Sequence, residues 1–311
     1  MAISNEELLA ILKAHIDTSV PAGIAGAQDA EEFIDLAVDQ TAVLRSIRVE
    51  TGIRSTFNLD NMALGEPVTV KATESTAPDP ADVVAVTRTR KVLQPQEIIA
   101  AFDVSFSFLR KNIERSRVNE RLNRIFAKRF GKDIVLMAFM GDTSNIGSTR
   151  TDKALKAIDG FVTQALTDPE AHAYTIPASP EYNTTVFPAM LELLPKDYRD
   201  QRDELGFFVS AAVYDAYARE IGSRATALGD MLLAGPWKEN LSYMGVKLYP
   251  VYGLDDGHIL LTLRENLVVG FGQELTVGRD VLNRERLLKV TLTAEVDAKY
   301  VVGDALVIGT A

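Results

Sequence analysis

Apolar residues recur at helical spacing through a long stretch in the first half of the chain. They are separated by sums of three and four positions, as on one face of an α-helix. These residues are Phe106, Leu109, Ile113, Leu122, Ile125, Phe126 and Phe130. No Pro or Gly interrupts the stretch before Gly131. The pattern predicts a helix from about Ser105 to Phe130, roughly 39 Å long.

A second period, of two residues, begins at Ser46. Apolar and polar positions alternate to Phe57, which predicts a strand, and Val83–Val92 predicts another. The turn-rich residues 77–82 lie between them, and residues 58–61 and 64–67 are expected to be irregular. The simplest interpretation is one long two-stranded excursion. Such a ribbon is marginal alone in water, so we expect a cover from outside the chain; the alternative is two strands of an ordinary sheet.

The first 44 residues predict two amphipathic segments and little core. The first segment, residues 1–20, has Ser4 as a helix cap with Glu7 three positions later. Residues 21–26 (PAGIAG) break it, and the second segment runs from Ala30 to Val43.

The remaining chain predicts a mixture of helices and strands. A strand at Ile98–Val104 leads into the long helix, and Gly141 begins a loop after Met140. Residues 165–184 are expected to be a loop. Further helices are predicted at 153–164, 185–194, 211–221 and 225–233, and further strands at 205–209, 246–251, 258–263, 267–271, 288–296 and 300–308, the last broken at Gly303.

Charge singles out the long helix. The chain carries net −10, yet residues 110–132 carry nine cations against Glu114 and Glu120. These cations are Arg110, Lys111, Arg115, Arg117, Arg121, Arg124, Lys128, Arg129 and Lys132. They form either a solvated face paired with acidic neighbours or a surface turned toward an anion. Phosphate contact would be non-specific and salt-dependent, and the absence of aromatic residues on this face argues against base stacking.

The sequence offers no catalytic chemistry. There is no Cys, and His15, His172 and His258 lie in separate segments without a second ligand at metal-binding spacing. The Gly-rich residues 270–278 do not match a dinucleotide loop. We therefore expect no enzyme, no catalytic or metal-binding residue and no cofactor. The N-terminus does not have the form of a signal peptide, and no apolar run is long enough to predict a transmembrane helix.

The order of these parts resembles the major capsid proteins of tailed bacteriophages, which have the Hong Kong 97 fold. Three stretches resemble the family's spine helix and the loop after it: 102–113, 126–130 and 138–142, the last with Gly141-Asp142 in place of Asn/Asp-Gly. Residues 241–251 resemble its G-x-P-V strand, with two extra residues before Pro250, and 281–308 resemble its closing strands. The resemblance covers residues 44–311.

The resemblance implies an α+β capsid fold in four parts. These are an N-terminal arm (1–44), an extended β-hairpin loop (45–93), a peripheral domain with the spine helix (94–144 and 281–311) and an axial domain (145–280). It implies hexamers and pentamers that form an icosahedral head around double-stranded DNA. The implied partners are other copies of the chain, a separate scaffolding protein, a portal, in some members a decoration protein, and packaged DNA, with no membrane. The implied location is the virion, after assembly in the host bacterial cytoplasm.

The resemblance also implies two sets of site residues. The DNA-facing set on the inner surface is Arg110, Arg117, Arg121, Arg124 and Lys128. The inter-subunit set in the extended loop is Arg54, Phe57, Leu64, Lys71, Arg88 and Arg90. Some members cross-link a loop Lys to an Asn, but no motif supports that chemistry at Lys71.

Two other functions stay open at the level of the sequence. An encapsulin-like nanocompartment shell has a similar fold, but the basic helix and the two-part arm favour a DNA-filled head. A soluble α/β enzyme without a recognisable motif would leave the ribbon and the arm without partners.

Overall fold

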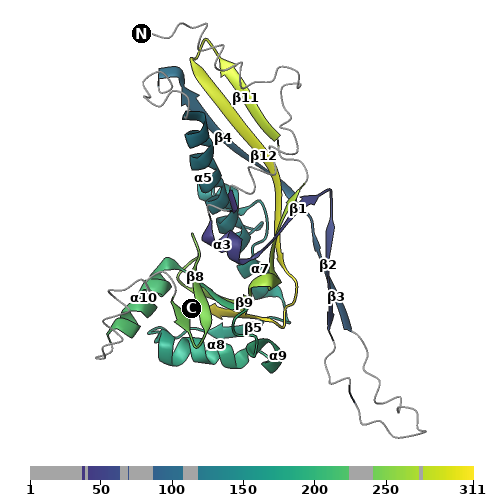
Figure 1. Ribbon diagram of the computed structural model, residues 1–311, viewed down its shortest axis with the longest axis vertical. Helices are drawn as coiled ribbons and strands as arrows, with labels where there is room; N and C mark the ends of the chain where they lie inside the picture. The colour runs from purple at the N-terminus through teal and green to yellow at the C-terminus, as the bar shows by residue number, and fades with distance from the viewer. Residues whose placement is uncertain are drawn as a thin grey trace, which may run out of the picture.

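Two β-sheets and a projecting two-stranded ribbon make up the molecule (Figure 1). The computed structural model describes residues 37–38, 41–63, 69, 87–107, 118–223, 241–272 and 276–311. The predicted arm segment 1–36 and the predicted helix 225–233 lie outside these residues.

The first sheet has five strands arranged around the long strand β12 (Leu287–Tyr300). One edge of β12 pairs with β4 (Gln96–Ser105), and the other pairs with β11 (Thr276–Leu282) and then β10 (Leu267–Gly272). A parallel strand, β1 (Arg48–Ile53), adds to β10. Alternate residues of β12 are buried, as its period of two predicted.

The long helix α5 (Val118–Met140) packs beside this sheet (Figure 1). The ring centres of Phe126 on α5 and Phe102 on β4 are 4.5 Å apart. The predicted C-terminal limit of the helix was wrong, because α5 continues past Phe130 to Met140. At the other end, β4 continues to Ser105 and residues 106–107 are helical, close to the predicted start. The C-terminal half is buried on several sides, which hides the one-faced pattern: Ile134, Val135, Ala138 and Phe139 are each 0% exposed.

A glycine in the middle of α5 allows another part of the chain to approach the helix. A Cβ at Gly131 would lie 2.5 Å from Thr41 Oγ1 and 2.7 Å from the Ala37 carbonyl oxygen. Glycine costs a helix interior about 1 kcal/mol relative to alanine. Here it lets Ala37 and Thr41, which precede the short helix α3 (Ala42–Ser46), lie directly against α5.

The second sheet has six strands in the order β5-β13-β9-β6-β8-β7. Phe187 at its core has ring contacts at 4.5 Å with Phe207 and 5.1 Å with Tyr217. The strands are β5 (His172–Thr175), β6 (Leu205–Val209), β7 (Ser242–Tyr243), β8 (Val246–Pro250), β9 (His258–Leu263) and β13 (Leu306–Thr310). The helical elements in this half of the chain are α6 (Arg150–Leu155), α7 (Phe161–Thr167), η2 (Tyr182–Val186, a π-helical turn), α8 (Phe187–Leu193), α9 (Lys196–Arg199), α10 (Ala211–Gly222) and η4 (Arg264–Asn266).

Local predictions in this half were partly wrong. The predicted helix 153–164 is two helices, α6 and α7, separated around Gly160, whose amide donates to the Gly141 carbonyl. The loop expected over 165–184 contains β5. The break predicted at Gly303 within residues 300–308 is confirmed, since β12 ends at Tyr300 and β13 starts at Leu306. The strands predicted near 205–209, 246–251, 258–263 and 267–271 are confirmed.

Asn266 joins the two sheets where the chain crosses between them. Its amide nitrogen donates to Thr262 Oγ1 and to the Val302 carbonyl, both at 2.9 Å. Its oxygen accepts from the backbone amides of Val301 and Val302. The side chain is buried, so these bonds satisfy its polar atoms while they hold both crossings together.

The ribbon consists of β2 (Phe57–Ala63) and β3 (Thr87–Leu93) and projects from the rest of the molecule (Figure 1). The prediction that its first strand covers 46–57 was wrong, because β1 belongs to the five-stranded sheet. Residues 58–61, expected to be irregular, lie in β2. An alternating pattern shows that a segment is a strand but does not show which strand it pairs with.

Candidate assembly surfaces

An apolar foot attaches the ribbon to the five-stranded sheet. Ile53, Leu59, Leu93 and Val268 form a buried cluster there. A Cβ at Gly270 would lie 2.7 Å from Ile53 Cδ1, so the glycine on β10 allows the side chains of Ile53 and Leu93 to pack against that strand. The foot is therefore packed as part of the core, while the ribbon continues outward.

A polar clamp (Lys91, Asp168 and Tyr300) holds the ribbon beside this foot. Asp168, just after α7, accepts from Lys91 Nζ at 2.8 Å and from the Tyr300 hydroxyl at 2.6 Å. The Lys91 ammonium also lies 3.6 Å from the centre of the Tyr300 ring, a cation–π distance. Three separate elements therefore meet on one partly buried carboxylate.

The clamp shifts the pKa values of Asp168 and Tyr300. Burial raises the pKa of Asp168, but the hydrogen bonds from Lys91 and Tyr300 outweigh it, so the pKa lies below its ordinary value. Burial and the neighbouring carboxylate both raise the pKa of Tyr300. At neutral pH Asp168 is charged and Tyr300 is neutral, which are the forms that the clamp needs.

A second carboxylate fixes the chain immediately after the ribbon. Asp297, in β12, accepts from the Gln94 amide at 2.7 Å and from the Ala298 amide at 2.8 Å. Burial raises the pKa of Asp297 above its ordinary value. Asp168 and Asp297 together fix the direction in which β3 enters β4.

Beyond the foot, one face of the ribbon is charged and exposed. Asp60 accepts from Arg90 Nε and Arg88 Nη2, each at 2.7 Å, and these bonds lower the pKa of Asp60. Met62, also on this face, is 67% exposed. An exposed Met beside two arginines is a surface suited to a partner with both apolar and acidic groups.

The described part of α5 carries a smaller basic surface. Lys128 is exposed. Arg129 pairs with Asp133 at 2.9 Å and donates to the Tyr252 hydroxyl at 3.3 Å. Lys132 Nζ lies 5.1 Å from the centre of the same Tyr252 ring.

The predicted site residues fall into three groups. Lys128, Arg88 and Arg90 are exposed, Phe57 packs on the apolar foot, and Arg54 is exposed between β1 and β2. Four others, Arg110, Arg117, Leu64 and Lys71, lie outside the described residues. Arg121 and Arg124 lie in α5, where the structure describes the backbone and not the side chains. The structure therefore brings Arg88 and Arg90 together on Asp60, and it does not test the DNA-facing set.

Sequence reasoning missed the clamp. Lys91 and Asp168 are separated by 77 positions, and Asp168 and Tyr300 by 132. No local sequence pattern predicts a contact between residues this far apart. The only available signal was that Lys91 and Tyr300 lie at the ends of predicted strands.

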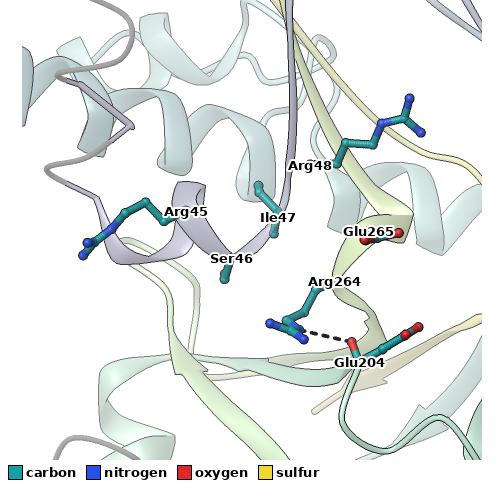
Figure 2. A pocket seen from close by; sticks show the side chains of 7 residues that line it. All are labelled: Arg45, Ser46, Ile47, Arg48, Glu204, Arg264 and Glu265. Carbon is teal, nitrogen blue, oxygen red and sulfur yellow. Dashed lines mark hydrogen bonds between the residues drawn. The ribbon is translucent and has the colours of Figure 1, made fainter.

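A pocket of about 460 Å³ lies between the start of β1 and the turn η4 (Figure 2). Its lining residues are Arg45, Ser46, Ile47, Arg48, Glu204, Arg264 and Glu265. Arg264 donates to the backbone carbonyls of Asp203 and Glu204, and the Ser46 hydroxyl donates to the Val43 carbonyl at 2.7 Å. The Ser46 hydroxyl is bonded to the backbone, and no histidine lines the pocket. The pocket therefore has no activated nucleophile.

Other functional features are absent from the described part of the chain. Its residues contain no group of three or more His, Cys, Asp or Glu that could hold a metal ion. Within the same residues, no helix has the length and apolar character needed to cross a membrane.

Comparison with known proteins gives one consistent result. No family model matches the chain. The chain is 25% identical over 312 residues to YqbE of Bacillus subtilis (strain 168), which is described as a prophage capsid protein, and the match covers 97% of each.

Solved structures share the fold along most of the chain. A satellite phage P4 procapsid, whose description includes the size determination protein Sid, matches with a TM-score of 0.68 and 12% identity, covering 99% of this chain and 98% of that one. The capsid of an empty GTA particle matches at 0.60 and 14%, covering 87% and 89%. Microbacterium phage Oxtober96 matches at 0.54 and 13%, covering 87% and 90%.

The chain therefore has the α+β Hong Kong 97-type capsid fold, as the sequence predicted. The shared fold and the full-length similarity together support a phage major capsid protein and favour neither the nanocompartment shell nor the enzyme.

Proposed function

We propose that copies of this chain assemble as hexamers and pentamers into the icosahedral head of a tailed phage, around double-stranded DNA. The observation that carries the proposal is the ribbon. Its foot is fixed by a buried cluster and a three-residue clamp, while Met62 farther out is exposed. A two-stranded ribbon held rigidly away from its own core gains stability by lying on another subunit.

The two sheets support a division of labour between domains. The peripheral domain is built on the five-stranded sheet and α5, and the axial domain on the six-stranded sheet, which gathers around the capsomer centre. The ribbon, from Phe57 to Leu93, is the extended loop, and the residues before α3 are the arm.

The basic face of α5 supports contact with the packaged DNA. Lys128 is exposed on it. We place Arg110, Arg117, Arg121 and Arg124 with Lys128 on the inner surface of the shell. Their contact with phosphate would be non-specific and would weaken with salt.

The proposed assembly also involves proteins other than the chain itself. A separate scaffolding protein and a portal would guide assembly in the host cytoplasm, and a decoration protein could bind the outside of the finished virion. In this proposal the chain contributes structure and not catalysis.

Electron microscopy of the purified chain, with light scattering, tests the proposal. We expect closed shells, rings of five or six subunits, or tubes, either alone or after co-expression with the neighbouring genes. A chain that stays monomeric or dimeric in both conditions would overturn the shell. Shells that contain protein and exclude DNA would favour the nanocompartment.

A further inference from the structure

The basic face of α5 has a candidate occupant within the chain itself. The N-terminal part of the chain enters the described structure on this helix, at Gly131. Thr41 Oγ1 donates to the Ala37 carbonyl at 3.1 Å, and Val38 packs against the main core. Ala37, the first residue that the structure describes, therefore lies against α5.

The face beside this entry point is basic by helical register. Positions 121, 124, 128 and 131 are three or four residues apart, so they share one side of the helix. Lys128 lies only three residues from Gly131, about 4.5 Å along the axis. Among the residues that the structure describes, Lys128 is exposed and makes no ion pair.

The segment that leaves from this point is acidic. Residues 1–36 contain seven Asp or Glu and one Lys, which gives a net charge of −6 with His15 neutral. Four of the seven lie close to the entry point: Asp29, Glu31, Glu32 and Asp35. Asp35 is two residues from Ala37, at most about 7 Å of extended chain.

We propose that the acidic segment 1–36 binds the basic face of α5 in its own chain. Opposite charges attract, and the contact of Ala37 with the helix at Gly131 raises the effective concentration of the segment far above that of a free ligand. The segment uses the same cations as DNA would, so it acts as an internal competitor that a polyanion must displace.

Carbodiimide cross-linking of the full-length chain tests the proposal directly, and the proposal does not depend on shell formation. We expect cross-links from Lys128 to Glu31, Glu32 or Asp35, and their loss in Lys128→Gln. The Lys91–Asp168 pair, in contact at 2.8 Å, is the positive control in the same digest. Detection of the control without any link from Lys128 to residues 1–36 would overturn the proposal.

An isotope mixture identifies which chain supplies the segment. Equal amounts of ¹⁵N-labelled and unlabelled chains are mixed before cross-linking. Links within one isotope support the proposal. Links that join two isotopes would assign the segment to a neighbouring subunit and overturn binding within the chain.

Binding of a short DNA duplex at low salt tests the competition. The variant Glu31→Gln/Glu32→Gln/Asp35→Asn should bind about tenfold more tightly than wild type. The control Glu192→Gln/Asp197→Asn/Asp200→Asn removes the same charge from exposed positions of the other half. Equal gains in both variants would reflect net charge alone and would overturn the competition.

Discussion

Asp168 connects three parts of the chain that no local pattern relates. It binds Lys91 of the ribbon and Tyr300 of β12, and both are partly or fully buried. Removing one partner of such a group leaves a desolvated charge or donor, which costs more than the bond itself gains. The clamp therefore determines where the ribbon points as well as how stable its foot is.

Replacing Asp168 with Asn should lower the free energy of unfolding at pH 7 by about 1–3 kcal/mol. The pKa of Asp168 is depressed in the folded state, so its stabilisation is complete above the unfolded pKa of about 3.9 and is lost as the pH falls through the folded pKa. Urea unfolding of the unassembled subunit against pH measures this.

The control for this prediction is Asp60→Asn, which removes the exposed pairs with Arg88 and Arg90 and should leave stability close to wild type. The difference between wild type and Asp168→Asn also separates Asp168 from Asp297, whose pKa shifts in the opposite direction. A difference that persists unchanged below about pH 3.9 would show that the carboxylate charge is not responsible.

Among the elements, the ribbon and α5 were predicted from the sequence pattern in part. Alternation predicted that strands surround a turn, and helical spacing predicted a long helix in the right region. The pairing partners of the strands could not be predicted, because apolar and polar residues alternate in both β1 and β2. Only the packing of Ile53 and Leu93 against Gly270 distinguishes β1, in the five-stranded sheet, from β2, in the ribbon. The last turns of α5 were missed since a helix buried on several sides loses its periodicity.

Shortening the ribbon tests its role as an element. Residues 64–86 are replaced by Asn-Gly, which favours a tight turn between the antiparallel strands β2 and β3. The subunit should fold, as judged by circular dichroism and thermal unfolding, because the foot and clamp are retained. Shells should not form. Shells of normal diameter from the shortened chain would show that the outer ribbon is not an inter-subunit contact.

In the whole molecule, the two sheets share two chain crossings held by Asn266, while the ribbon extends beyond both (Figure 1). The sequence predicted the fold through its order of parts and through its resemblance to capsid proteins. It could not predict the clamp or the entry of the arm at Gly131, because both depend on contacts between distant segments. On the ribbon, Met62 is 67% exposed, and this is the surface that the proposed neighbouring subunit would cover.

A cryo-electron microscopy reconstruction of the assembled particle would show whether the ribbon contacts a neighbouring subunit in a shell. We expect a closed icosahedral shell in which each ribbon, 57–63 with 87–93, lies across a neighbouring subunit while the Lys91–Asp168–Tyr300 clamp stays intact. A ribbon folded back onto its own chain, or a particle without hexamers and pentamers, would contradict it.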